Sequence, residues 1–247
     1  YDYAMAAPLM VDIYNKDSSD ILILGMGTGT YATQCKKYFA DKNPTIEGVE
    51  IDEKITALSK KYFNASDDVK VTTYDGRAYL HAVKNTYAYQ DITIPFQMSS
   101  KEFFTLVKGH LKPDGVMVVN MNMRGGGEGN INQYLSDTIS TVFPEVFTVD
   151  VSNSSNRVLF ASDNAKMTQV FDNNLARVTD TSLYSAMYGV KTNYEKYSPT
   201  GKYILTDDKA PVELLGMKVV DRMISDELSY YKEIFKKEGL KGLLNSF

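Results

Sequence analysis

The residues with the clearest chemical potential are three alternating glycines that follow a short apolar run. Residues 21–24 are apolar, as in a buried strand, and Gly25, Gly27 and Gly29 come directly after them. Glycines at the carboxyl end of a strand allow a tight turn and leave bare backbone against which a nucleotide can pack. Glu50 follows about one strand-helix-strand unit later, so it should end the neighbouring parallel strand and face the same crevice. A carboxylate there can accept hydrogen bonds from both hydroxyls of a ribose, which predicts an adenosine-containing cofactor.

The class of cofactor is indicated by the position where a further glycine would stand. The dinucleotide fingerprint G-x-G-x-x-G ends in a glycine, but Thr30 occupies that position here. The Lys-Ser/Thr ending of a P-loop is also absent, so nothing marks a triphosphate site. The remaining pattern is typical of the S-adenosylmethionine class, in which no phosphate is bound. An ordinary strand-to-helix turn would explain the glycines alone, but less readily the glycines together with Glu50.

Composition narrows the possible partners. The 247 residues carry a net charge of −4 and include 43% hydrophobic residues, so one sizeable core is expected and nucleic acid is not an expected partner. His81 and His110 have no ligand-spaced neighbours, and we expect no metal. Cys35 is the single cysteine, which suits a reducing, cytoplasmic location. Because Tyr1 is not a methionine, the sequence leaves open a preceding portion of the protein, a membrane portion included. A homodimer is a separate expectation.

Strand-like and helix-like segments alternate through the first two thirds of the chain, as in a doubly wound α/β fold with a mostly parallel sheet. We expect an α/β domain over residues 1–162 that binds the nucleoside, and a helical extension over residues 163–247 packed on it, interrupted by a tyrosine-rich loop at 194–203. The expected strands are 21–24, 45–50, 69–73 and 116–121, the expected helices are 31–39, 53–63, 78–83 and 99–111, and 146–151 with 157–161 should form an antiparallel closing hairpin.

The fourth strand of such a sheet has no apolar counterpart in the sequence. Residues 84–90 are mostly polar, although the fourth strand should lie next to the first at the crevice. We therefore expect that about six residues, the usual length of a buried strand, are absent between Tyr87 and Ala88. The alternative is a truly deleted strand, which should fold poorly because it exposes the edge of the central sheet.

Taken together, several segments resemble the spermidine synthase family, the aminopropyltransferases built on the methyltransferase fold. That resemblance implies a seven-stranded sheet of the methyltransferase type. Residues 205–213 look like the tail of spermidine synthase-like domains that some bacterial proteins carry fused behind membrane segments. The segments that carry the resemblance are 21–29, 49–52, 74–80, 91–95 with 100–104, and 111–115, within a coverage of about 1–162.

The resemblance implies roles for residues around a nucleoside. Glu50 matches the acid that holds the ribose hydroxyls, and Ile51 is placed to touch the face of the adenine. Asp75 matches the acid that accepts a hydrogen bond from the adenine amino group, and Gly76 lets the ring come close. The glycine turn at 25–29 would pack against the remaining part of the cofactor.

The resemblance also implies an amine site. Asp91 matches the second aspartate of the family's loop after the fourth strand, which helps to bind the amine, and we take Asp91 as the catalytic candidate with Tyr89 beside it in the substrate site. The family's first aspartate, the general base, would fall in the absent segment. Thr28 stands where synthases have an aspartate that grips the amino group of decarboxylated S-adenosylmethionine, so the preference for that donor is in question.

The function implied is transfer of an aminopropyl group from decarboxylated S-adenosylmethionine to a diamine such as putrescine, without a metal. Thr28 favours one alternative, a methyltransferase that uses S-adenosylmethionine itself. A second alternative is a non-catalytic domain that binds a nucleoside or polyamine within a larger protein. The fold alone does not separate these functions, because they depend on the site.

Overall fold

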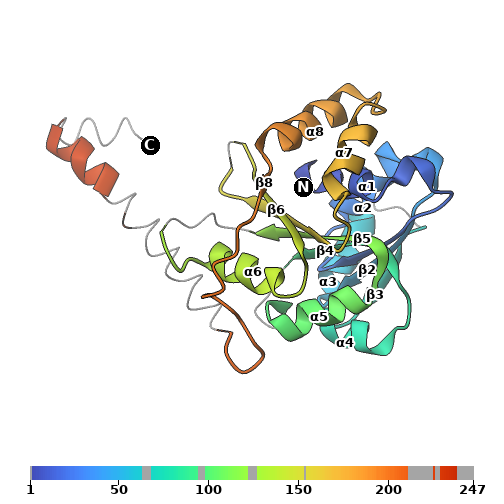
Figure 1. Cartoon of the computed structure of the whole chain (residues 1–247), viewed down its shortest axis with the longest axis horizontal. Coiled ribbons are helices and arrows are strands. Elements are labelled where there is room, and N and C mark those ends of the chain that lie inside the picture. Colours follow the sequence, from blue (N-terminus) through green and yellow to red (C-terminus); the bar gives the residue numbers. More distant parts are fainter. Residues whose placement is uncertain are drawn as a thin grey trace.

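The part of the chain that the structure describes forms a mixed sheet with helices on both faces (Figure 1). This computed structural model describes residues 2–62, 68–93, 98–121, 127–152, 154–210, 225 and 229–237, and the side chains of 60, 61 and 89–93 are outside the description. Within these ranges no helix combines the length and the apolar character needed to cross a bilayer.

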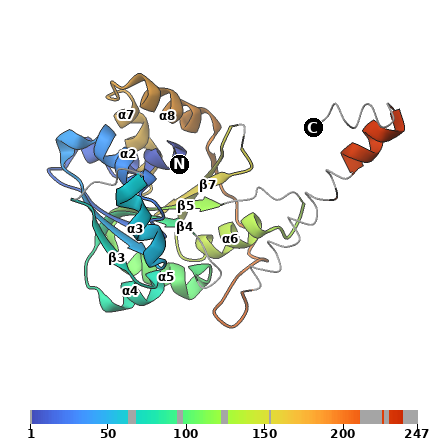
Figure 2. The same ribbon diagram turned by 180° about the vertical axis from the view of Figure 1, so that it is seen from behind.

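The sheet of the described residues has eight strands in the order β3-β2-β1-β4-β5-β7-β6-β8. The first five of that order are parallel, whereas β7 is antiparallel to both β5 and β6, as the closing hairpin predicted. Seen from behind, β3 and β7 lie toward opposite ends of the sheet (Figure 2). The strands are β1 Asp20–Leu24, β2 Thr45–Glu50, β3 Lys70–Thr73, β4 Tyr87–Thr93, β5 Leu111–Met121, β6 Glu145–Asp150, β7 Arg157–Ser162 and β8 Glu195–Lys196.

The predicted α/β class is confirmed, but the strand number differs by one. The short strand β8 lies in the segment expected to be a loop, where it pairs with Phe147 and Thr148 of β6. Two residues are too few to show a period-2 pattern, so the pairing arises from the exposed edge of β6 rather than from the local sequence.

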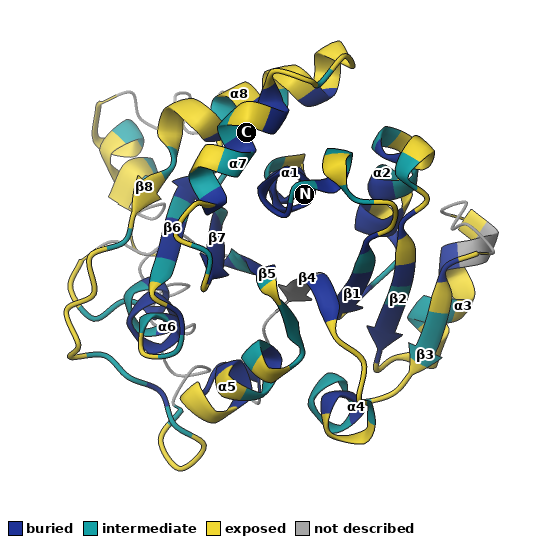
Figure 3. Cartoon of the chain, turned by 45° about the vertical axis from the view of Figure 1, so that its right-hand side comes forward, coloured by how far each residue is buried: buried dark blue, intermediate teal, exposed yellow. Residues whose placement is uncertain are grey.

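Helices cover both faces of the sheet, and side chains alternate between two cores. Ile21 and Ile23 of β1 face the core beneath α1, α7 and α8, whereas Leu22 and Leu24 face the core beneath α4, α5 and α6 (Figure 3). This alternation is the period of two expected for a strand buried on both sides. The helices up to residue 193 are η1 Asp2–Met5, α1 Ala6–Met10, η2 Ile13–Asn15, α2 Thr30–Tyr38, η3 Ala40–Lys42, α3 Glu53–Tyr62, α4 Gly76–Ala82, α5 Lys101–Gly109, α6 Ile131–Ser140, α7 Met167–Leu175 and α8 Thr181–Asn193.

The helices after the hairpin pack against the beginning of the chain. Helix α7 contacts α1, and α8 contacts η1. The Asn174 side chain donates a hydrogen bond to the carbonyl of Leu9, 2.8 Å away. The domain boundary at 162 stays a prediction, and residues 211–224, 226–228 and 238–247 of the expected extension lie outside the described residues.

Strand β4 corrects the expectation that no strand follows Lys84. Tyr87 and Ala88 are consecutive residues of β4, which lies between β1 and β5 with a shift of register after Tyr87. A central strand finds backbone partners on both edges, so hydrogen bonding can hold a polar sequence in the extended form. The sequence pattern missed this strand because its position is set by its neighbours.

Residues 200–209, called here the tail segment, are anchored to α6 by a buried carboxylate. Asp137 is 1% exposed and accepts hydrogen bonds from the Tyr197 hydroxyl, the Thr200 backbone and hydroxyl, and the Tyr203 backbone. Burial alone would raise the pKa of Asp137, but these hydrogen bonds outweigh it, so the pKa lies below its ordinary value. The ionised carboxylate therefore stabilises the fold.

Replacing Asp137 with asparagine should destabilise the protein at pH 7 by about 1–3 kcal/mol, because an amide offers a single acceptor oxygen. A carboxylate whose pKa is lower in the folded state contributes its stability above the unfolded pKa and loses it as the pH falls through the folded pKa. The difference in urea midpoints between variant and wild type should therefore narrow below about pH 4. Equal midpoints at pH 7 would show that the anchor is dispensable, and Asp163→Asn, at an exposed ion pair with Lys108, is the control.

Candidate functional site

The glycine turn forms at the carboxyl end of β1, as predicted. Gly25, Gly27 and Gly29 all have positive φ angles, of 77°, 57° and 85°. Side chains other than glycine are strained in that region, which explains the residue type at each position. The backbone N–H groups of Gly25 and Met26 donate to the carbonyl of Val49 at 2.9 and 3.0 Å, so the turn is joined to β2.

A second contact between the turn and β2 was not found from the sequence. A Cβ atom on Gly48 would lie 1.9 Å from the sulfur of Met26, so the methionine side chain packs directly on the bare backbone of β2. A glycine inside a strand often marks such a close approach, and that was the available signal. Together with the hydrogen bonds to Val49, this packing fixes the glycine turn against the strand that carries Glu50.

Glu50 ends β2 and is fixed by two backbone amides. One carboxylate oxygen accepts from the N–H of Gly27 at 2.8 Å, and the other accepts from the N–H of Asp52 at 3.1 Å. The residue is 7% exposed. These two hydrogen bonds pre-orient the carboxylate. Because each of its oxygens can accept more than one hydrogen bond, the carboxylate can still accept hydrogen bonds from a ligand. The predicted position of Glu50, beside the turn at the end of a parallel strand, is confirmed.

Asp75 lies at the same edge of the sheet, after β3. The neighbouring strands β2 and β3 pair Glu50 with Thr73, two residues before Asp75. Its carboxylate caps α4 by accepting from the N–H of Ala78 at 2.8 Å. A Cβ on Gly76 would face Met98 and Leu24 at ordinary contact distances, so that side of the glycine points to the core.

Two exposed apolar side chains flank these carboxylates. Ile51 is 65% exposed and Tyr74 is 52% exposed, and they follow the ends of the paired strands β2 and β3. The N–H of Tyr74 donates to the carbonyl of Glu50 at 3.0 Å. Large exposed apolar residues next to fixed polar groups are a common feature of ligand sites. Tyr74 was not singled out from the sequence as a site residue.

The amine-site residues are placed only by their backbone. Asp91 lies within β4, paired with Ile23 of β1 and Val118 of β5, rather than in the loop after the strand. Tyr89 lies in the same strand, and the side chains of both residues are outside the description. Thr28 lines a small cavity within the glycine turn, together with Ile23, Gly25, Met26, Gly27, Thr30 and Tyr31.

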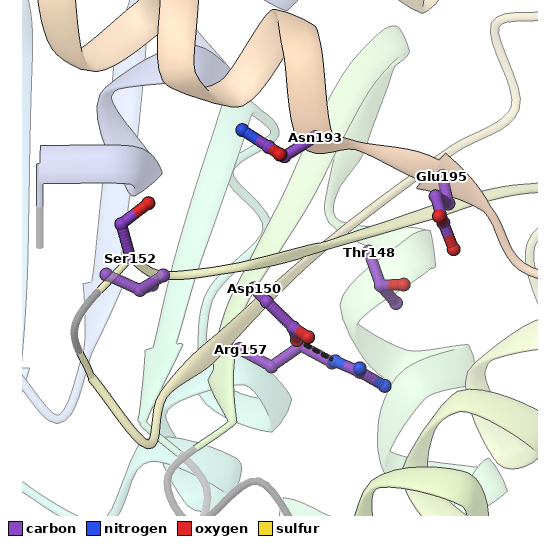
Figure 4. Close-up of a pocket in the computed structure, with 7 residues that line it drawn as sticks. Thr148, Asp150, Ser152, Arg157, Asn193 and Glu195 are labelled. Carbon is purple, nitrogen blue, oxygen red and sulfur yellow. Dashed lines mark hydrogen bonds and ion pairs between the residues drawn. The ribbon is translucent and has the colours of Figure 1, made fainter.

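A separate polar cavity lies where the β6–β7 hairpin meets α8 and β8 (Figure 4). Asp150 of β6 and Arg157 of β7 form an ion pair across its floor, 2.6 Å apart. The other lining residues are Thr148, Val151, Ser152, Asn193 and Glu195. None of the predicted nucleoside or amine residues lines this cavity.

A family model described as "Spermine/spermidine synthase domain" matches residues 5–173. A "Probable polyamine aminopropyl transferase" of Bifidobacterium longum is 48% identical over 268 aligned residues, which cover all of this chain and 59% of that protein. A "Polyamine aminopropyltransferase" of Vibrio vulnificus is 26% identical over 161 residues, 60% of this chain and 52% of that protein. The chain thus spans little more than half the length of these relatives.

The alignment with the Bifidobacterium relative is longer than the chain itself, so that relative carries residues within the aligned region that this chain lacks. The alignment length does not locate these residues, so the expectation that about six are absent between Tyr87 and Ala88 stays a prediction.

Solved structures share the fold at low sequence identity. A spermidine synthase in complex with the transition state analogue AdoDATO has a TM-score of 0.58 and 18% identity, covering 75% of this chain and 69% of the other. Human methyltransferase-like protein 13 in complex with SAH also has a TM-score of 0.58, with 17% identity over 81% of this chain and 96% of the other. The methyltransferase-like architecture is therefore common to both kinds of neighbour.

Proposed function

The chain belongs to the spermine/spermidine synthase family, and from this premise we propose that it transfers an aminopropyl group from decarboxylated S-adenosylmethionine to a diamine such as putrescine. The observation that carries the proposal is the carboxylate of Glu50, fixed by the N–H groups of Gly27 and Asp52 beside the glycine turn. This pre-oriented acceptor at the carboxyl edge of a parallel sheet suits the two hydroxyls of a ribose.

The nucleoside would lie across the ends of β1, β2 and β3. Glu50 binds the ribose, Asp75 accepts a hydrogen bond from the base, and the exposed side chains of Ile51 and Tyr74 contact the faces of the ring. These groups come from two adjacent strand ends, and the glycine turn follows the end of a third, so one ligand of nucleoside size can contact all of them.

In the proposed reaction the amine nitrogen forms a bond to the propyl carbon next to sulfur, while the carbon–sulfur bond breaks and its electron pair stays on sulfur. The sulfonium becomes a neutral thioether, and the nitrogen loses a proton to a carboxylate. Asp91 is our candidate for holding the amine beside that carbon. Catalysis of this kind depends mainly on positioning, because the sulfonium already carries a good leaving group, the neutral thioether.

Thr28 bears on the identity of the donor. It lines the cavity in the glycine turn and offers a hydroxyl but no negative charge. A donor that keeps its carboxylate would meet no repulsion there, so a methyltransferase activity with S-adenosylmethionine is the second candidate.

Calorimetric titration followed by a product assay tests the proposal. We expect decarboxylated S-adenosylmethionine and methylthioadenosine to bind, and spermidine to form when putrescine is added. Tight binding of S-adenosylmethionine alone would favour the second candidate. Binding of the nucleosides without product from any amine would instead indicate a non-catalytic domain, and failure of all ligands to bind would overturn the cofactor class.

We also propose that the protein is cytoplasmic and forms a homodimer. The relatives extend well beyond the aligned region, which leaves room for a further portion, a membrane portion included. A cytoplasmic location and a homodimer stay predictions, as does the packing of residues 163–247 as one extension.

A further inference from the structure

The tail segment runs from α6 to the beginning of α5, two helices that come much earlier in the sequence. Leu205 is fully buried, its N–H donates to the Thr138 hydroxyl, and its carbonyl accepts from the N–H of Lys101, both at 2.9 Å. In Figure 1 the segment is the orange loop beside α5 and α6. It therefore ends at the amino termini of helices that follow the carboxyl edge of the sheet.

Asp207, near the end of the tail segment, joins two of these helices. Its carboxylate makes a two-pronged ion pair with the guanidinium of Arg77, with N–O distances of 2.8 and 2.5 Å. The hydroxyl of Ser100, which caps α5, also donates to this carboxylate. The N–H of Asp207 donates to Glu102 at 3.0 Å. One residue thus holds the first turns of α4 and α5 together.

The ion pair between Arg77 and Asp207 fixes the relative orientation of the two side chains as well as attracting them. A planar guanidinium that binds both oxygens of a carboxylate fixes orientation, which a single point charge does not. The hydrogen bonds from Arg77 lower the pKa of Asp207, so the pair is ionised at neutral pH. Arg77 lies two residues after Asp75, within the turn that Asp75 caps. Holding Arg77 therefore holds the backbone from which the Asp75 side chain extends.

We propose that Asp207 is a positioning residue for base recognition: through Arg77 it fixes the first turn of α4 so that Asp75 meets the 6-amino group of a purine. The inference rests on the proposed function and deepens it by naming the determinant of base selectivity. A 6-amino group donates to a carboxylate, whereas the 6-oxo group of hypoxanthine is an acceptor and is repelled by it. Selectivity between the two bases therefore reports the position of Asp75.

The experiment compares methylthioadenosine with methylthioinosine by calorimetry. We expect wild type to prefer the adenine nucleoside by at least roughly tenfold, the range of one hydrogen bond to a charged group. Asp207→Asn and Arg77→Lys should each reduce that preference by roughly tenfold, because both break the two-pronged contact. Asp163→Asn is the matched control, since it removes an ion pair of similar exposure with Lys108, at 2.7 Å, and should leave the preference unchanged.

The outcomes separate this inference from the proposed function. If neither nucleoside binds wild type, the proposed function fails. If wild type discriminates and both variants discriminate equally well, the function stands and the role of Asp207 is refuted. An equal loss of affinity for both nucleosides would also refute it, because a merely structural defect does not depend on the base. Arg77→Lys keeps the charge and carries the test if Asp207→Asn does not fold.

Discussion

Replacing Asp91 with asparagine is expected to lower kcat/KM for the amine by about two orders of magnitude while leaving nucleoside affinity unchanged. A carboxylate can attract an ammonium group and accept a proton, whereas an amide of the same shape does neither at neutral pH. The backbone of Asp91 lies between Ile23 of β1 and Val118 of β5, in the strand beside the glycine turn. Steady-state rates with putrescine, together with calorimetry of methylthioadenosine, measure the two effects separately.

Asp163→Asn serves as the control for the loss of one negative charge. An Asp91→Asn enzyme with the wild-type rate would remove Asp91 from catalysis. A parallel loss of nucleoside affinity would point instead to a general disturbance of β4. The location of Asp91 inside the strand makes this second measurement necessary.

Replacing Glu50 with glutamine should weaken nucleoside binding by about 1–3 kcal/mol. Both carboxylate oxygens accept backbone N–H groups, from Gly27 and Asp52. A glutamine NH2 group must face one of these donors, so the side chain turns away or leaves an amide unpaired. In either case the acceptor geometry for a ribose is lost. Calorimetry with methylthioadenosine is the measurement.

Glu47→Gln is a demanding control, because it makes the same substitution on the same strand. Glu47 accepts hydrogen bonds from the hydroxyls of Tyr79 and Tyr87 at 3.0 and 2.7 Å. It also forms an ion pair with Lys70. It lies near the amino end of β2, so it should affect stability but not affinity. Equal affinity losses in both variants would mean that Glu50 acts through the fold, and an unchanged affinity in Glu50→Gln would refute the ribose assignment.

Local pattern was sufficient for much of the fold and for the edge of the sheet where the glycine turn meets Glu50. Strong apolar runs such as residues 21–24 predicted buried strands, and the spacing from Gly25 to Glu50 predicted two parallel neighbours. The hairpin strands were placed within a residue or so of β6 and β7. These features depend on residues close in sequence, where side-chain periodicity and turn chemistry act directly.

Features that depend on distant neighbours were missed or misplaced. Strand β4 forms because β1 and β5 each offer a row of backbone partners, although its own residues show no apolar run. The same holds for β8, which pairs with the edge of β6. A polar sequence can form a strand when the tertiary structure supplies its hydrogen bonds, and no local pattern reports this.

By itself, the sequence determined that a glycine turn and Glu50 meet at one edge of a parallel sheet, because both follow from short-range spacing. Only the tertiary structure decided that Met26 packs on Gly48, that Asp91 lies within a strand, and that Asp207 reaches Arg77. Each of the three depends on where separate segments of the chain come to lie in space, and contacts between distant segments leave no periodic trace in either one.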